Sequence, residues 1–333
     1  MNKLQEPFVS VITPAYNMGR FLSECIESVL GQTYRNFEYI IVDNCSTDDT
    51  SEIVERFARA DKRIRAYRNE QLLQIIANHN RAFRLISPES KYCKVVCADD
   101  WVLPECLARM VDLAEANPSV GIVGSYQLSG GGPDWRKWRV RWDELPYPSP
   151  VIPGREICRR YLLGGPYVFG TPTSILYRAD LVRREDSFYP NSTAEADTSA
   201  CIKYLSDSDF GFVHQVLSYE RIHQAQISAT SKEFHAYWLS KLSDLHEYGS
   251  LYLTAGELEK RLKELMEEYY ALLAVSAVNF REKAYWIYHE RRLKEIGYPP
   301  NRAKLVKAII LKLLDLLLNP KQTIDKLLGR FNQ

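Results

Sequence analysis

The chain has 333 residues, 46% of them hydrophobic and 26% charged, which is ordinary for a globular protein. The formal net charge of +1 excludes a protein that gathers nucleic acid through a strong overall positive field. The seven cysteines include no Cys-x-x-Cys pair, which favours a reduced chain over a disulfide framework. The first residues do not resemble a signal peptide, and no uncharged apolar stretch approaches the ~20 residues that a transmembrane helix needs. We therefore expect a cytoplasmic protein that binds no nucleic acid.

Strand and helix patterns alternate along residues 8–128. Short apolar runs predict strands at 8–13, 37–42, 63–68, 92–98 and 120–128. Apolar residues at helical spacing predict helices at 18–30, 52–60, 75–86 and 104–117. This order predicts right-handed crossovers and an α/β fold with a doubly wound, mostly parallel sheet flanked by helices.

Polar groups follow three of these predicted strands directly. The first strand leads into Pro14-Ala15-Tyr16-Asn17, the second ends at Asp43, and the fourth ends at Asp99-Asp100. In open α/β sheets, ligands bind beyond the carboxyl ends of the strands, so these groups should share one rim. Paired carboxylates there suit Mg²⁺ or Mn²⁺ with a phosphate ligand, although Asp100 and its neighbour could instead cap the next helix.

The pattern changes after the predicted strand at 120–128. Residues 129–133 are predicted to be a flexible break, and a segment of alternating aromatic and basic residues follows (Trp135, Arg136, Lys137, Trp138, Arg139, Arg141, Trp142). Such a segment could stack on a sugar or pair with a phosphate, or it could form an edge hairpin packed on the body. Strand and helix patterns resume at 155–222, and the chain after about residue 227 is predicted to be almost entirely helical.

The last segment, 301–333, carries seven Lys or Arg residues and two Asp residues. Residues 303–318 are strongly apolar with a narrow polar stripe, which is typical of a basic amphipathic helix on an anionic membrane surface. Alternatively, this helix packs on its own domain or on a second copy in a homodimer.

Four segments together resemble family 2 of the inverting glycosyltransferases. They are Pro14-Ala15-Tyr16-Asn17, residues 28–34 (Ser-Val-Leu-Gly-Gln-Thr-Tyr), residues 37–48 (Phe-Glu-Tyr-Ile-Ile-Val-Asp-Asn-Cys-Ser-Thr-Asp) and Ala98-Asp99-Asp100-Trp101. The resemblance covers residues 7–117 and continues more weakly to 228. It implies a GT-A fold at 1–228, with a nucleotide-binding half (1–117) and an acceptor half (118–228), followed by a helical region at 229–333.

The resemblance implies a role for each matching residue of the nucleotide-binding half. Tyr16 would stack at the nucleotide base, Asp43 would accept a hydrogen bond from it, and Asp99 would bind the metal that bridges to the diphosphate. Asp100 would face the donor sugar, and further nucleotide contacts would come from Pro14, Ala15, Asn17, Gln74 and Asn80. Asp43 could instead cap the turn that follows it. One departure is Cys97, which stands where many members have the first Asp of Asp-x-Asp.

In the acceptor half, Asp197 matches the family's general base, which takes the proton of the acceptor hydroxyl. Ala196 replaces the Glu that usually precedes this base, so Glu195 is the fallback, and Asp197 could alternatively be a simple helix N-cap. The resemblance also implies acceptor-side contacts from Gly170, Thr171 and Trp101. Arg221 would contact the diphosphate, and His223 would be a second metal ligand.

We therefore expect a Mn²⁺- or Mg²⁺-dependent inverting enzyme that moves a hexosyl or N-acetylhexosaminyl group from a UDP-linked donor. The acceptor would be a saccharide or a lipid-linked molecule in the synthesis of cell-surface polysaccharide or glycolipid, with peripheral membrane contact through 301–333. One alternative is a catalytically degenerate nucleotide-binding scaffold, because Cys97 and Ala196 both replace acids. A sugar-phosphate nucleotidyltransferase is disfavoured because residues 14–20 hold one Gly and one Arg, and a dehydrogenase because no GxGxxG motif follows the first strand.

Overall fold

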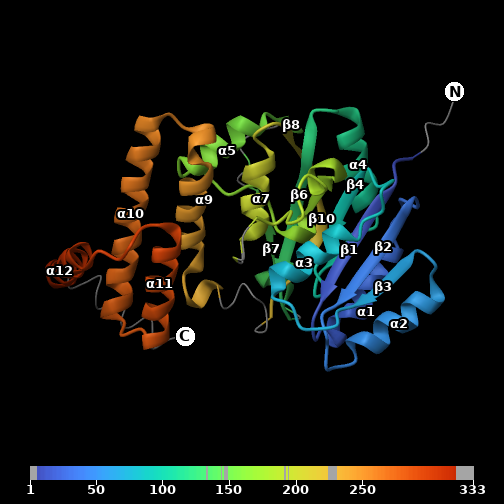
Figure 1. Cartoon of the computed structure of the whole chain (residues 1–333), viewed down its shortest axis with the longest axis horizontal. Coiled ribbons are helices and arrows are strands. Elements are labelled where there is room, and N and C mark those ends of the chain that lie inside the picture. The colour runs from blue at the N-terminus through green and yellow to red at the C-terminus, as the bar shows by residue number, and fades with distance from the viewer. Residues whose placement is uncertain are drawn as a thin grey trace. The chain divides into compact units, whose positions relative to one another are not determined.

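The computed structural model of the chain divides into two compact units, Met1–Ala229 and Thr230–Gln333 (Figure 1). The structure describes residues 6–132, 134–143, 145, 149–190, 193, 195–223 and 231–319.

A single ten-stranded sheet forms the centre of the first unit, in the order β3-β2-β1-β4-β9-β6-β10-β5, with β7 beside β6 and β8 beside β10. The strands are β1 (Val9–Ala15), β2 (Phe37–Asp43), β3 (Ile64–Arg68), β4 (Tyr92–Val95), β5 (Trp101–Val102), β6 (Val120–Gly130), β7 (Arg139–Arg141), β8 (Val151–Ile152), β9 (Ile175–Arg178) and β10 (Asp209–Arg221). The pairs β1–β2, β1–β4, β2–β3 and β6–β10 are parallel, and β9 joins the two parallel groups by pairing antiparallel with both β4 and β6. The predicted α/β class with a mostly parallel sheet is confirmed.

Helices cover the sheet because each presents one apolar stripe. In α1 (Gly19–Leu30) this stripe is Leu22, Cys25, Ile26 and Val29, all fully buried in the core that also takes residues from β1, β2 and β4. The other helices of this unit are α2 (Thr50–Ala60), α3 (Ile75–Arg84), α4 (Cys106–Ala116), α5 (Gly154–Leu162), α6 (Ala179–Val182) and α7 (Ala196–Tyr204), with short 3-10 turns η1 (Trp135–Lys137) and η2 (Pro172–Ser174).

Two predicted boundaries differ from the structure. The predicted strand at 92–98 ends at Val95, because the chain turns toward the two acids that follow. The predicted break at 129–133 begins later, since β6 continues to Gly130, pairing with β10 up to Gly130 and with β7 up to Ser129. The aromatic-basic segment is therefore the arm of a β6–β7 hairpin.

The second unit is helical, with α9 (Ala236–Tyr252), α10 (Ala255–Val278), α11 (Lys283–Ile296) and α12 (Arg302–Leu318). A capping box starts α10, in which Glu257 Oε2 accepts a hydrogen bond from the Thr254 N–H at 2.9 Å. The last helix contacts α10, yet none of its residues is fully buried. Among the described helices, none combines the length and the apolar character needed to cross a membrane.

Candidate active site

The rim predicted from the sequence is set by the strand register of β1, β2 and β4. Ala15 at the end of β1 is level with Asp43 at the end of β2, and Ile12 is level with Val95 at the end of β4. Backbone pairing continues one residue past the strands, where the Asn44 N–H donates to the Ala15 carbonyl at 2.8 Å. The polar segments that follow these strands therefore leave the sheet at the same edge.

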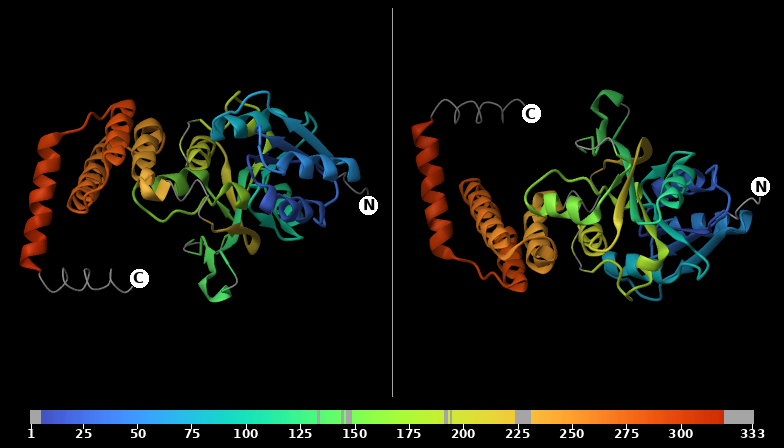
Figure 2. Two further views of the ribbon diagram at one scale, coloured as in Figure 1. Left: turned by 90° about the horizontal axis from the view of Figure 1, so that it is seen from below. Right: turned by 90° about the horizontal axis from the view of Figure 1, so that it is seen from above.

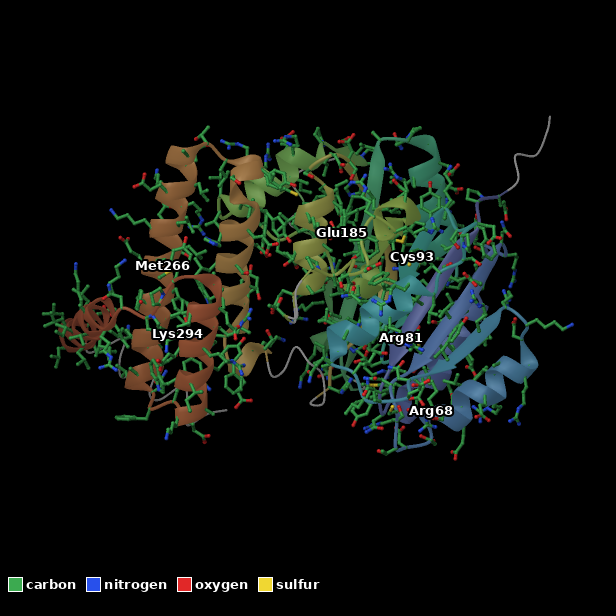
Figure 3. The ribbon with its side chains drawn as sticks, viewed as in Figure 1. Arg68, Arg81, Cys93, Glu185, Met266 and Lys294 are labelled. Atoms are coloured by element: carbon green, nitrogen blue, oxygen red, sulfur yellow. The ribbon has the colours of Figure 1, made fainter. Side chains whose placement is uncertain are left out.

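Asp43 is buried at this edge and holds the turn that follows it. Its carboxylate accepts hydrogen bonds from the Ser46 N–H at 3.0 Å and from Ser51 Oγ at 2.5 Å. Arg68, at the end of β3 (Figure 3), lies 3.6 Å from the same carboxylate. The capping role that the sequence left open is thus present, and the contact with a nucleotide base stays a prediction.

Tyr16 and Asn17 form a fixed, exposed corner above β1. Asn17 takes the left-handed conformation, with φ +51°, which an Asn tolerates well. Its N–H donates to Ser46 Oγ at 2.9 Å and its Oδ1 accepts from the Thr47 N–H at 2.8 Å. Tyr16 is 42% exposed, while Pro14 and Ala15 lie in the buried strand. The corner leaves an aromatic ring available at the rim.

The two acids after β4 have different surroundings. Asp99 Oδ2 lies 3.0 Å from His223 Nε2, and both side chains retain partial exposure. Asp100 is buried, and its carboxylate accepts hydrogen bonds from Thr173 Oγ1 at 2.6 Å and from the Arg221 N–H at 3.0 Å. Burial, and next the charge of Asp99, raise the pKa of Asp100 well above its usual range. Asp99 is therefore the accessible carboxylate, and Asp100 anchors the turn from inside.

Arg221 holds this turn from the neighbouring strand β10. Its Nε donates to the Asp99 carbonyl at 3.0 Å, and its guanidinium is also paired with Glu24. The rings of Phe21 and Trp101 each lie 4.8 Å from the guanidinium carbon. Arg221 thus positions the acid pair, while the predicted contact with a diphosphate remains to be tested.

The donor atoms at this turn fit a divalent cation. Single ligand atoms of Cys97, Asp99 and Asp100 lie within 4.8 Å of one another, and His223 adds an imidazole nitrogen beside Asp99. Carboxylate oxygen and imidazole nitrogen suit Mn²⁺, and carboxylate oxygen with water suits Mg²⁺. Burial raises the pKa of the Cys97 thiol well above its usual range, so the oxygen and nitrogen atoms are the better ligands here.

Asp197 lies in the first turn of α7, and it is buried. Burial is the main cause that raises its pKa to about 7, with the nearby Glu195 adding to it. The N-cap position of the helix belongs to Glu195, and the Asp197 carboxylate accepts hydrogen bonds from backbone N–H groups inside the first turn, so it also stabilises the start of the helix. A carboxylate with a pKa near neutrality suits a general base, although this role itself stays a prediction.

The predicted acceptor-side loop packs between the acids and α7. Gly170 has φ +98°, and a Cβ there would lie 2.1 Å from Ser174 Oγ, so only glycine fits. The Tyr167 hydroxyl donates to the Gly170 carbonyl at 2.6 Å and lies 2.9 Å from Thr198 Oγ1 in α7. Thr171 Oγ1 donates to Gln127 Oε1 of β6 at 2.9 Å.

Thr173 and Lys94 support the site and were not identified from the sequence. Thr173 Oγ1 accepts from the Cys97 N–H at 3.1 Å while it donates to Asp100. The fully buried Lys94 ammonium donates to the carbonyls of Thr173 and, at 3.0 Å, Ile175. A lysine inside an apolar strand was the available signal, because a buried cation needs polar partners from another segment.

Two predicted nucleotide contacts, one at the N-cap of α3 and one within the helix, have contrasting exposure. Asn80 is buried, and its amide makes two hydrogen bonds with the backbone of Tyr189, at 3.0 Å to the carbonyl and 2.9 Å from the N–H. Gln74 is exposed at the N-terminus of the helix. The structure gives Asn80 a packing function, and a contact of either residue with a nucleotide stays a prediction.

A mostly parallel sheet flanked by helices, with acidic residues where its strands end, is the architecture of the GT-A class of glycosyltransferase. Residues 10–184 match the family model described as glycosyl transferase family 2. The chain therefore belongs to glycosyl transferase family 2, and it is an enzyme of the glycosyltransferase class.

The similar curated proteins align mainly with the nucleotide-binding half. Glycosyltransferase GlyG of Streptococcus pneumoniae is 35% identical over 126 residues, which are 37% of this chain and 41% of GlyG. The putative teichuronic acid biosynthesis glycosyltransferase TuaG of Bacillus subtilis is 36% identical over 143 residues, 43% of this chain and 56% of TuaG. The chain thus spans about half or less of the length of several of these relatives.

Solved structures extend the likeness of the fold to most of the chain. TarS 1–349 of S. aureus in complex with UDP-GlcNAc has a TM-score of 0.63 at 16% identity, covering 90% of this chain and 89% of that one. The mannosyltransferase PcManGT of Pyrobaculum calidifontis, in complex with GDP-Man and Mn²⁺, has a TM-score of 0.51 at 17% identity. The match covers 94% of this chain and 88% of the PcManGT chain. At these identities the similarity supports the fold.

Proposed function

We propose that this enzyme transfers a sugar from a UDP-linked donor to a saccharide or lipid-linked acceptor, with inversion at the anomeric carbon. The observation that carries this proposal is the pair of acids after β4. The partly exposed Asp99 faces His223 at 3.0 Å, while Asp100 and Arg221 hold the turn through hydrogen bonds on its buried side. Such an arrangement is suited to hold a cation against a diphosphate.

The donor is assigned from the rim and from the family. Tyr16 offers an exposed ring for a base, and the turn 43–47 is fixed below it by the Asp43 and Asn17 hydrogen bonds. TarS was crystallised with UDP and UDP-GlcNAc, and PcManGT with GDP-Man, which supports a nucleotide-sugar donor. Asp43 would accept a hydrogen bond from the base, most naturally the N3–H of uracil or thymine, and UDP is the donor nucleotide that we propose.

The cation would be Mn²⁺ or Mg²⁺, held by Asp99 and His223. When bound, such a cation neutralises charge on the leaving diphosphate. The chain itself keeps the Asp99 carboxylate available for the cation. Arg221 donates a hydrogen bond to the Asp99 carbonyl, and the Thr173 hydroxyl donates one to the carboxylate of the neighbouring Asp100.

Asp197 is the proposed base, with Glu195 as the fallback. Inversion requires a carboxylate on the face of the sugar opposite the leaving group, where it removes the proton from the acceptor hydroxyl. The burial of Asp197 raises its pKa to about 7, which makes the carboxylate a stronger base than an exposed one. Gly170, Thr171 and Trp101 would border the acceptor.

The biological setting is proposed from the last helix and from the relatives. TuaG is named for teichuronic acid biosynthesis, a pathway of cell-surface polymer, and we place this enzyme in cell-surface polysaccharide or glycolipid synthesis. The apolar face of α12 with its lysines would hold the enzyme peripherally on the cytoplasmic side of a membrane. Residues 320–333 of the predicted basic tail lie outside the described residues, and a homodimer through this helix is the competing arrangement.

The test is the thermal stability of the full chain with UDP, GDP, CMP, dTDP and ADP, each with and without Mn²⁺. A ligand that binds only the folded state raises the melting temperature, so UDP with Mn²⁺ should give the largest rise. In the Asp99→Asn variant, the Mn²⁺-dependent part of the rise in melting temperature should disappear. Glu105 is an exposed acid on the next turn, so the Glu105→Gln variant should behave as wild type.

Turnover of matching UDP-sugars then separates the enzyme from a scaffold. UDP binding without hydrolysis or transfer of any donor would point to the degenerate scaffold, and no stabilisation by any nucleotide would contradict the proposed function.

A further inference from the structure

The β6–β7 hairpin carries a group of exposed cations that the proposed mechanism does not use. Residues 134–143 hold four basic side chains and two acidic ones (Arg136, Lys137, Arg139 and Arg141; Asp134 and Asp143). Arg136 is paired with Asp134 at 2.9 Å. Lys137, Arg139 and Arg141 are exposed and have no carboxylate partner within the described part of the chain. Exposed cations without counter-charges favour an anionic ligand.

Aromatic contacts fix this hairpin to both parts of the site. Trp138 packs over Gly130, where a Cβ would lie 2.4 Å from the indole, and it meets Tyr219 edge-on at 5.1 Å. Tyr219 in turn stacks on Trp101, the residue directly after the acid pair, with the ring centroids 3.7 Å apart. On the other side, Trp142 lies 5.1 Å from Tyr167, the residue that contacts the acceptor-side loop and α7. The hairpin is thus anchored between the acids and the proposed base.

Strand register determines where the arginines point. Arg141 is level with Gln127 and Arg139 with Ser129 across the antiparallel pair, so each arginine shares a sheet face with its partner. Gln127 is the residue that accepts the hydrogen bond from Thr171 of the acceptor-side loop. The two arginines therefore lie on the face that carries the proposed acceptor border, and Figure 2 shows the hairpin projecting beside the end of β10.

Glu220 places one carboxylate near this face. Glu220, beside Ser129 on β10, accepts a hydrogen bond from Ser129 Oγ at 2.8 Å and forms no ion pair with the arginines among the described residues. Arg139 uses one nitrogen for the carbonyls of Arg136 and Trp138, at 2.8 and 2.9 Å, which fixes its direction without neutralising its charge. Both guanidinium groups keep N–H donors for a ligand.

We infer that this hairpin is an acceptor-binding arm that selects a saccharide bearing carboxylate or phosphate groups. The inference rests on the proposed function, because it assigns the chemical class of the acceptor at the same site. Arginine donates to both groups through two parallel N–H bonds. A long nucleic acid fits less well, since the acids of the rim and Glu220 border the same face and the net charge is only +1.

The test uses two matched pairs of probes, measured by fluorescence anisotropy on the full chain with UDP and Mn²⁺ present. One pair is labelled oligogalacturonate and its methyl ester, and the other is phosphorylated dextran and plain dextran. We expect at least one charged probe to bind about 10-fold more tightly than its neutral partner, since a few exposed ion pairs contribute about this much. Arg139→Gln with Arg141→Gln should remove this difference and leave UDP binding unchanged.

The control is Arg59→Gln with Lys62→Gln, which removes the same charge from the α2–β3 region and should change nothing. Equal binding of charged and neutral probes, no binding of either charged probe, or no effect of the arginine substitutions overturns the inference. Equally tight binding of single-stranded RNA also overturns it, because the arm would then recognise any polyanion. Loss of UDP binding in the wild-type chain would instead contradict the proposed function.

Discussion

Asp197 shows how the surroundings of one residue change its pKa. The side chain is buried near the start of α7, and burial is the main reason that its pKa rises to about 7. An unfolded Asp has its pKa near 3.8, so the native state binds the proton more tightly than the unfolded state. The contribution of Asp197 to stability is therefore fully present below about pH 4 and is lost as the pH rises through about 7.

For activity, the same pKa predicts a pH dependence. We expect kcat/KM to rise with pH up to about 7 and then to level off, because the base works in its ionised form. Asp197→Asn should keep UDP binding and lose transfer by at least about 100-fold, the usual scale of general-base catalysis. Initial rates with a UDP-sugar across pH measure both effects, and an active Asp197→Asn enzyme would move the role to Glu195.

For stability, Asp197→Asn should have the opposite effect to most site substitutions. Above about pH 7.5 the wild type carries a buried charge, at a cost of at most about 4 kcal/mol from the pKa difference, and the amide removes it. Melting temperatures of the two proteins should agree near pH 4 and separate above pH 7, with the variant higher. Identical curves at every pH would show that Asp197 ionises in a solvated setting.

At the level of elements, α3 and its N-cap carry two predicted nucleotide contacts that differ in burial. Asn80→Ala removes both hydrogen bonds to Tyr189 and should lower the free energy of unfolding by roughly 2–4 kcal/mol, since it leaves buried backbone groups unpaired. Gln74→Ala changes an exposed side chain and should leave stability within about 0.5 kcal/mol.

Denaturant unfolding and UDP titration of both variants distinguish the two functions. If UDP affinity falls with Gln74→Ala alone, the donor contact belongs to the start of α3. If Asn80→Ala loses UDP affinity without losing stability, the contact lies at Asn80 and the packing argument is wrong.

The sequence predicted the local elements well and the long-range pairings poorly. The first two strands and α1 begin and end within two residues of the predicted positions, because periodicity and capping residues are local signals. The insertion of β9 antiparallel between β4 and β6 could not be predicted, since it depends on pairing between segments some eighty residues apart along the chain. For the same reason Asp99, Asp100 and Asp43 were identified from their strand ends, whereas Thr173 and Lys94, which support them from elsewhere, were missed.

On the scale of the whole molecule, α12 is the element whose surface is least explained by its own unit. Its packed side, toward α10, includes Leu305, Ile309 and Leu316, while a broad apolar face remains exposed (Val306, Ile310, Leu311, Leu313, Leu314, Leu317 and Leu318). Lys304 and Lys307 flank that face and form no ion pair among the described residues, whereas Lys312 pairs with Asp315 at 2.7 Å.

We expect the full chain to bind anionic liposomes through this helix. Lys304→Glu with Lys307→Glu should weaken binding to phosphatidylserine vesicles by at least about 10-fold, since each basic residue near the surface contributes about 1 kcal/mol. Co-sedimentation with anionic and neutral vesicles measures the binding of each variant. The charge-matched control is Lys260→Glu with Lys263→Glu on α10. Unchanged binding together with a dimeric mass in solution would support the homodimer instead.

The Thr173 hydroxyl has a consequence for substrate affinity, because it belongs to the proposed acceptor-side loop yet is bonded to Asp100, the acid beside the proposed metal ligand Asp99. A donor that draws the acid pair toward its diphosphate also pulls on that loop, and an acceptor that shifts the loop pulls on the acids. Such coupling is reciprocal, so donor and acceptor must change each other's affinity by the same factor. A dissociation constant for UDP-sugar measured alone would then differ by that factor from the value with acceptor bound.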